Sequence, residues 1–304
     1  MMLRIAKLAV PLAVLALLMW WADAEAVIQR LQGADLVWLG IAVVTLTALT
    51  LLMAKRWQIV TVALNMELPF GRAIREYYIS QLVNLVLPGG VAGDVGRAIR
   101  TRHEGDLVRA AQSVAAERFL GQIALFVVMG VAFAFAMLVP GGIDWPSFIW
   151  LGIAALFGAA AVFVVLARTH TATGRFLRVV ADLMSNAGLI LNAVVITALL
   201  VFSLYACARA TGTVIPLNAV FTLIPLILST MLIPLSVGGW GWREGAAAAL
   251  FPIIGASPSA GIAMGIAYGA MMTIAALPAL VFLAGPLESK SLTQNTNRGS
   301  TWHI

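Results

Sequence analysis

Five long stretches of this chain contain no Asp, Glu, Lys or Arg, and they constrain the fold more than any other feature. They cover residues 119–143, 145–167, 183–208, 210–242 and 245–287. A helix needs about 20 mostly apolar residues to cross the hydrocarbon core of a bilayer. Only 11% of the residues are charged, against about 25% in soluble domains. The sequence therefore predicts an all-α, polytopic integral membrane helical bundle.

The basic residues predict the orientation of this bundle. We expect spans near residues 8–22, 36–54, 119–139, 148–167, 190–208 and 261–284. With a cytoplasmic N-terminus, nearly all Lys and Arg residues fall in cytoplasmic loops, which is the usual bias of membrane proteins. Both termini are then cytoplasmic. We expect residues 1–287 to form the membrane domain and 288–304 a disordered cytoplasmic tail. Cleavage of the first span after Ala22-Asp23-Ala24 is the alternative.

Residues 77–95 are apolar enough to enter lipid but short for a crossing. Arginines flank the segment on both sides, so a crossing would place one basic group outside. We therefore expect a re-entrant hairpin from the cytoplasmic side. Pro88, Gly89 and Gly90 form its turn, because glycine allows positive φ and proline ends a helix.

A second broken segment covers residues 216–256. It is interrupted by Pro216, Pro225, Pro234, Gly238, Gly239 and Gly241. Five expected spans precede this segment, so it starts on the external side, and one final span returns the C-terminus to the cytoplasm. The segment should therefore enter and leave on the external side, or cross an even number of times. We expect a second re-entrant hairpin, opposed to the first. Inverted-repeat transporters build substrate sites where two broken elements meet near the middle of the membrane.

Charged residues follow the glycines of the first hairpin. A helix beginning near Gly93 would present free backbone N–H groups and a positive dipole end, which together with Arg97 suit a phosphate. Asp94 caps that helix or neutralises the positive charge of Arg97. The alternative is a structural Asp–Arg pair. Asn84 belongs to a polar stripe on the preceding helix, which lines a cavity or packs against another helix.

The second glycine segment ends in Arg243 and Glu244. Neighbours on a helix point in different directions, so we expect them to pair with other elements, Glu244 with Arg97 or Arg118. The alternative is an interfacial loop. Glu117 and Arg118 precede an expected span and are interpreted as a solvated helix start.

The sequence gives little support for an enzyme. It shows no nucleophile–base–orienter set, phosphate loop or nucleotide fingerprint. The lone Cys207 excludes a disulfide framework, and the histidines are scattered, so we expect no metal or other cofactor. The net charge of +6 comes from loop residues, so we assign it to topology and lipid headgroups rather than to nucleic acid.

Two motifs resemble the lysylphosphatidylglycerol synthase transmembrane-region family, also called flippase-like or UPF0104. They are Asn84-x-x-Leu87-Pro-Gly-Gly-x-x-Gly-Asp94-x-x-Arg97 and Pro234-x-Ser-x-Gly-Gly-x-Gly-x-Arg243-Glu244. The resemblance implies a bacterial inner-membrane protein that moves a lipid or lipid-linked headgroup between leaflets. Longer relatives carry a soluble aminoacyl-transferase domain that does not follow here, so lipid aminoacylation is not implied.

We therefore expect a lipid flippase whose partner is an anionic phospholipid or lipid-linked headgroup. Two rivals are a lipid-modifying enzyme using Asp94 and Glu244 as acid and base, and a non-catalytic scaffold for a lipid-synthesis complex. Further partners would be a second copy of the chain or lipid-pathway proteins. The expected substrate-binding residues are Arg97, Arg243, Asp94, Glu244, Asn84, Gly89, Gly90, Gly93, Gly238, Gly239, Glu117 and Arg118.

Overall fold

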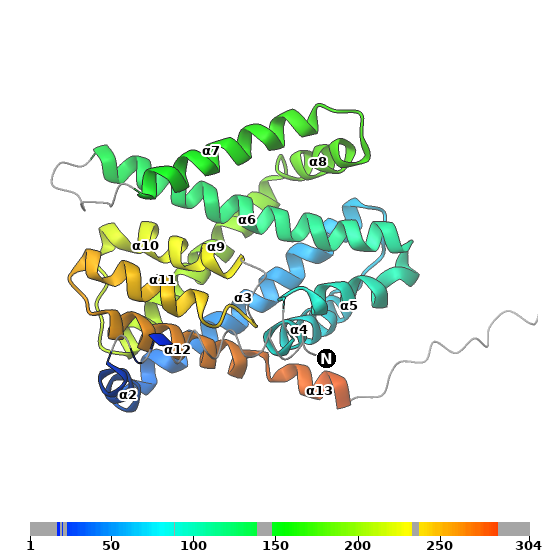
Figure 1. Ribbon diagram of the computed structural model, residues 1–304. Helices are drawn as coiled ribbons and strands as arrows, with labels where there is room; N and C mark the ends of the chain where they lie inside the picture. The colour runs from blue at the N-terminus through cyan, green and yellow to red at the C-terminus, as the bar shows by residue number, and fades with distance from the viewer. Residues whose placement is uncertain are drawn as a thin grey trace, which may run out of the picture.

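The computed structural model describes residues 17–18, 20, 23–87, 89–138, 148–232 and 237–284, and all regular secondary structure in them is helical (Figure 1). The α-helices are α2 (Ala24–Gln32), α3 (Leu36–Ala63), α4 (Phe70–Val86), α5 (Ala92–Thr101), α6 (Leu107–Leu138), α7 (Phe148–Ala167), α8 (Ala172–Leu183), α9 (Ala187–Ala210), α10 (Leu217–Ser229), α11 (Trp242–Leu250), α12 (Pro258–Ala276) and α13 (Pro278–Ala284). Short 3₁₀ turns are η1 (Arg102–Glu104), η2 (Thr230–Leu232) and η3 (Phe251–Ile254).

Four helical segments of the described residues are long and apolar enough to cross a membrane. They are Leu36–Ala63, Leu107–Ala136, Ala187–Ala210 and Pro258–Ala284. This confirms the all-α polytopic membrane fold. The expected span at 148–167 coincides with α7. The expected first span lies mostly outside the described residues, and the expected tail 288–304 lies wholly outside them.

The expected start of the span near residue 119 is wrong. Helix α6 begins at Leu107 rather than near residue 119. Asp106 caps it, because its carboxylate accepts a hydrogen bond of 2.7 Å from the backbone N–H of Arg109. Glu117 and Arg118 consequently lie well inside a long helix and do not form a solvated helix start.

Two helical hairpins approach each other from opposite ends of the molecule (Figure 1). The first consists of α4 and α5, joined by a turn in which Gly89 and Gly90 have φ of 96° and 63°. The second consists of α10 and α11. Before α11, three glycines again have positive φ, at 56°, 82° and 88°. Glycine adopts these angles without steric penalty, which confirms the glycine pairs as turns.

The tips of the two hairpins touch. Gly238 lies against Leu85, in the last turn of α4. A side chain at position 238 would place its Cβ 3.1 Å from Leu85 Cδ2 and 3.4 Å from its Cα. The expected opposition of two broken elements is therefore a direct contact.

Helices α3 and α9 run antiparallel along the middle of the bundle. The backbone N–H of Asp35, before α3, donates to the carbonyl of Ala210, the last residue of α9, at 2.9 Å. Further along, the Asn192 amide donates to the carbonyl of Leu52 at 3.4 Å. Large apolar side chains from both helices, together with α10 and α12, form the main core.

Candidate functional site

Buried charged side chains from α3, α5 and α6 meet around Glu117. Glu117 Oε1 accepts hydrogen bonds from Arg56 Nη2 at 2.6 Å, Arg56 Nε at 3.2 Å and the Tyr77 hydroxyl at 3.3 Å. Oε2 accepts from Arg97 Nη2 at 2.9 Å. Both Glu117 and Arg97 are fully buried. We call Arg56, Asp94, Arg97, Glu117 and Arg118 the Glu117 network.

Asp94 is the second carboxylate of the network. Its Oδ1 lies 3.1 Å from Arg97 Nη2, and its Oδ2 lies 2.7 Å from Arg118 Nη2. The Ser80 hydroxyl and the Asn84 amide each donate to it at 3.2 Å. Asp94 therefore links Arg97 to Arg118 and ties both arms of the first hairpin together.

The close approach of α4 and α5 requires glycine at position 93. A Cβ there would lie 2.0 Å from the backbone oxygen of Ser80, far inside van der Waals contact. The backbone N–H of Gly93 donates to Asn84 Oδ1 at 2.7 Å. Asn84 thus uses its amide group for Asp94 and its carbonyl for the start of α5, which fixes the position of the carboxylate.

Two aromatic rings contact the guanidinium of Arg97. Its Cζ lies 4.6 Å from the ring centroids of both Trp57 and Tyr77, within cation–π range. Trp57 is fully buried and donates from its indole N–H to Ser113 at 3.1 Å. Arg97 Nε and Nη1 have no hydrogen-bond partner in the described part of the chain.

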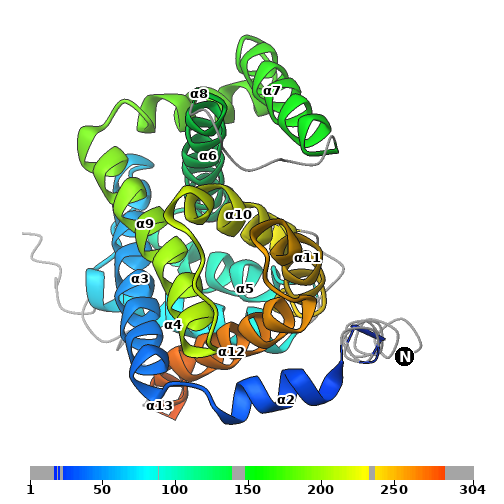
Figure 2. The same ribbon diagram turned by 90° about the vertical axis from the view of Figure 1, so that its left-hand side faces the viewer.

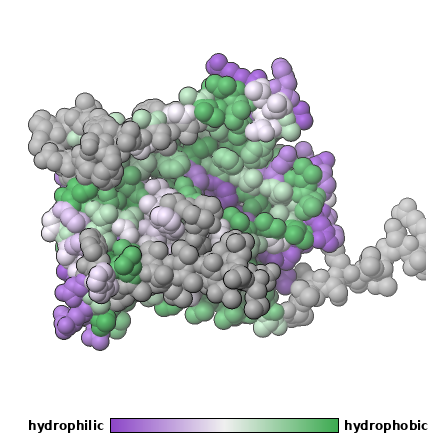
Figure 3. Space-filling view, in the orientation of Figure 1, coloured by the Kyte–Doolittle hydropathy of each residue, from purple (hydrophilic) through white to green (hydrophobic). Residues whose placement is uncertain are grey.

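The ion pairs of the Glu117 network join three arginines to two carboxylates, an excess of one positive charge. The Arg118 side chain is 44% exposed, whereas Arg97 and Glu117 are sealed. Figure 3 shows hydrophilic surface set back beside α6, with apolar surface around it. The excess charge is therefore reachable from outside through Arg118.

A second buried pair lies at the start of α11. Glu244 Oε1 accepts from Arg243 at 2.5 Å from Nη2 and 3.1 Å from Nε. Its Oε2 accepts the backbone N–H of Gly241 at 2.6 Å and so caps the helix. The expectation that these neighbours pair with other elements is wrong, because capping turns Glu244 back toward the helix start, where Arg243 reaches its other oxygen.

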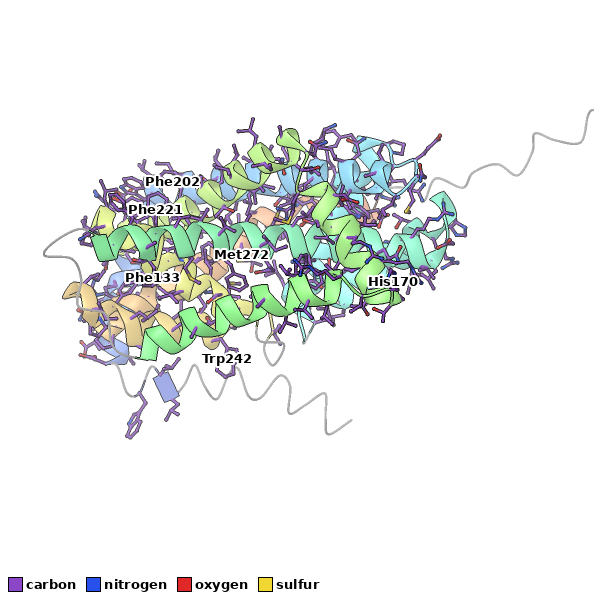
Figure 4. All side chains as sticks on the ribbon, turned by 90° about the horizontal axis from the view of Figure 1, so that it is seen from above. Phe133, His170, Phe202, Phe221, Trp242 and Met272 are labelled. Carbon is purple, nitrogen blue, oxygen red and sulfur yellow. The ribbon has the colours of Figure 1, made fainter. Side chains whose placement is uncertain are left out.

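Aromatic rings also contact Arg243. Its Cζ lies 5.1 Å from the Trp240 ring and 5.3 Å from the Tyr268 ring. A Cβ on Gly269 would lie 2.5 Å from Arg243 Nη2 and 2.6 Å from the Trp240 ring, so glycine makes room for both. We call Arg243, Glu244, Trp240 and Tyr268 the Arg243 cluster. Trp242, in contrast, lies at the outer edge of the molecule (Figure 4).

The structure divides the expected site residues into three groups. Asn84, Gly93, Asp94, Arg97, Glu117 and Arg118 lie in or against the Glu117 network. Arg243 and Glu244 form the separate cluster, and Glu244 pairs with neither Arg97 nor Arg118. Gly89, Gly90, Gly238 and Gly239 lie in the hairpin turns.

The sequence prediction missed Arg56 as a member of the site. The expected span ending at residue 54 places Arg56 in a cytoplasmic loop, but α3 continues to Ala63 and Arg56 is 1% exposed. The apolar stretch after Arg56, up to Ala63, was the signal that the helix goes on. The aromatic partners Tyr77 and Tyr268 carried no such signal.

Comparisons with known proteins support a single family. Residues 8–280 match the family model described as Lysylphosphatidylglycerol synthase TM region. The chain is similar to a UPF0104 membrane protein of Pyrococcus horikoshii, with 27% identity over 146 residues, which cover 46% of this chain and 42% of that protein. The match thus spans less than half of the curated relative.

Proposed function

Because this chain belongs to the lysylphosphatidylglycerol synthase transmembrane-region family, whose members are membrane proteins of lipid biology, we propose that it is a lipid flippase. It would move an anionic phospholipid, or a lipid-linked anionic headgroup, between the leaflets of the bacterial inner membrane. The basic loops would face the cytoplasm, following the positive-inside bias.

The observation that carries this proposal is the excess positive charge of the Glu117 network, with Arg118 half-exposed. A charge at the centre of a membrane helix costs about 2.5–3.5 kcal/mol on insertion scales. A phosphate that binds there neutralises the excess and receives charge-assisted hydrogen bonds from the guanidinium. The acyl chains would remain in the bilayer against the apolar helix surface.

The arginines have different roles in this proposal. Arg118 meets the headgroup first because its side chain is accessible. Arg97 and Arg243 are sealed in the structure, so they bind the headgroup only when the hairpins rearrange. Asp94 and Glu244 hold the arginines in place between binding events.

A lipid-modifying enzyme using Asp94 and Glu244 together has less support. Glu244 is bonded to Arg243 and to the backbone of Gly241. Asp94 is bonded to four different side chains, those of Ser80, Asn84, Arg97 and Arg118. An acid–base pair must reach the same reacting atoms, and these two carboxylates have separate surroundings.

The test is lipid movement by purified protein in vesicles. NBD-labelled phosphatidylglycerol is reconstituted in both leaflets, and dithionite bleaches the outer leaflet. Wild-type protein should expose the inner-leaflet probe, and Arg118→Ala should slow this at least tenfold. Arg109→Ala is the matched control, because Arg109 lies on the same helix with its side chain 51% exposed.

The specificity of movement is tested with NBD-labelled phosphatidylcholine, which carries no net charge and should move more slowly. Thermal unfolding in detergent should show that Arg118→Ala is folded. Wild-type rates for Arg97→Ala, Arg118→Ala and Arg243→Ala would contradict the site.

A further inference from the structure

The helices α3–α6 and α9–α12 form two units with the same pattern of contacts. In each unit the first helix packs on the second, the second on the third, the third on the fourth and the fourth on the first. Figure 2 shows α9, α10, α11 and α12 arranged as such a ring. The broken pair of helices occupies the second and third positions of both units.

The contacts between the two units also come in corresponding pairs. Helix α3 packs on α9, its counterpart. Helix α6 packs on α10, and correspondingly α12 packs on α4. Likewise α3 packs on α12, and α9 packs on α6. This reciprocity is what a two-fold relationship between the units requires.

The two units are inverted relative to each other. Helices α3 and α9 are antiparallel, as the Asp35–Ala210 and Asn192–Leu52 hydrogen bonds show. The two hairpins consequently enter from opposite ends (Figure 1). This is the arrangement of inverted-repeat transporters, in which the units rock around a site between them.

The second helix of each hairpin also carries an arginine with similar contacts. Arg97 and Arg243 are both fully buried, both bonded to a glutamate, and both in contact with a Trp ring and a Tyr ring. The surroundings differ in exposure. The Glu117 network reaches the surface through Arg118, whereas Arg243 and Glu244 are 0% exposed.

The hairpin tips lie between these two groups. Leu85 is the neighbour of Asn84, which bonds Asp94. Gly238, on the other tip, lies five residues before Arg243 in the sequence. The contact between Leu85 and Gly238 therefore joins a residue next to the Glu117 network to the turn that leads into the Arg243 cluster. The glycines on both sides have positive φ and can absorb a change of hairpin angle.

We propose that the Leu85–Gly238 contact is a gate between the Arg97 site and the Arg243 site, and that the inverted units open one site at a time. This inference rests on the proposed flippase function and adds the path of the headgroup. In the structure the gate is closed, with the Glu117 side open. Movement of the headgroup to Arg243 requires the two tips to separate.

A reversible disulfide across the gate tests this directly. Leu85→Cys and Gly238→Cys are combined with Cys207→Ala, which removes the native thiol. A Cβ at position 238 would lie 3.4 Å from Leu85 Cα, so cysteines at the two positions are near enough to be joined by oxidation. Oxidation should lower movement of NBD-labelled phosphatidylglycerol at least tenfold, and dithiothreitol should restore it. The two single-cysteine variants should be insensitive to oxidation.

Full cross-linking by mass spectrometry with an unchanged rate would overturn the gate, as would failure to cross-link in folded protein. Leu85→Ala provides a second variant without strain at position 238. It should speed movement and weaken the preference for the anionic probe over the phosphatidylcholine probe, and unchanged rates for both probes would overturn the gate. If wild-type protein moves neither probe, the proposed function fails, and the gate fails with it. If the reduced double-cysteine variant moves the probe, the flippase function holds. An unchanged rate after oxidation then counts against the gate alone.

Discussion

Arg97 and Glu117 come from different helices and form an ion pair of 2.9 Å in which neither side chain is exposed. Glu117 also bonds Arg56, so one carboxylate compensates two buried guanidinium groups. Removing one partner of a buried pair leaves the other charge desolvated and uncompensated. Loss of the Glu117 carboxylate would therefore affect both Arg56 and Arg97.

We expect Glu117→Gln to lower the free energy of unfolding by about 3–5 kcal/mol, the usual penalty for breaking a buried ion pair. Thermal or denaturant unfolding in detergent measures this. The control is Asp106→Asn, which affects an exposed pair of 3.5 Å with Arg109 and keeps a good helix cap. Equal stability of the two variants would show that Glu117 does not hold the network.

Gly93→Ala should prevent α4 and α5 from packing. The new Cβ would lie 2.0 Å from the Ser80 backbone oxygen, and backbone cannot move as a flexible side chain can. We expect the free energy of unfolding to fall by about 1–3 kcal/mol, the range for overpacking. We also expect lipid movement to be lost. Unfolding measurements and the vesicle assay check both.

Gly71→Ala is the matched control for that variant. Gly71 lies in the same helix as Ser80, and a Cβ there meets nothing within 4 Å. Its effect should stay within about 1 kcal/mol, because alanine is the better helix former. A Gly93→Ala protein as stable and active as Gly71→Ala would contradict the close approach of the hairpin arms.

Glu244→Gln should be more damaging than the removal of both charges of its pair. The single change leaves Arg243 buried without its carboxylate, at a cost of about 3–5 kcal/mol. Replacing both Arg243 and Glu244 by Met leaves no buried charge, which is often close to neutral for stability. Detergent unfolding of the two variants should rank the double change as the more stable.

The double variant also separates stability from function. If Arg243 binds the headgroup, Arg243→Met/Glu244→Met should remain folded and still move labelled phosphatidylglycerol at least tenfold more slowly than wild type. A folded double variant with the wild-type rate would exclude the Arg243 cluster from the path.

Asp94→Asn should strengthen anion binding and slow transport. The change raises the excess charge of the Glu117 network from one to two and frees Arg118 from its partner. A unit charge about 8 Å away contributes about 2 kcal/mol at an effective dielectric constant of about 20. We therefore expect roughly thirtyfold tighter binding of labelled phosphatidylglycerol at low salt, with slower release.

Fluorescence anisotropy of the detergent-solubilised protein measures that affinity, and the vesicle assay measures the rate. Asp35→Asn is the control, because Asp35 caps α3 at the other end of the bundle and asparagine caps equally well. Weaker binding by Asp94→Asn would mean that the carboxylate holds Arg118 in its binding position.

Much of the candidate site was predictable because its residues are expensive in a membrane. Asp94, Arg97 and Arg243 stood out as charges beside glycines in apolar sequence. The prediction failed where a charge was assigned to an expected span end. Arg56 and Glu117 lie within α3 and α6, which are longer than the apolar runs suggested, and the two side chains compensate each other there.

The sequence by itself determined the all-helical membrane fold and the two glycine turns, because hydrophobic length and backbone freedom are local properties. Only the tertiary structure decided which charges pair. Arg56 reaches Glu117 across 61 positions of sequence, and Leu85 reaches Gly238 through helix packing. Such partners are chosen by the packing of helices that are distant in the chain, which no local pattern records.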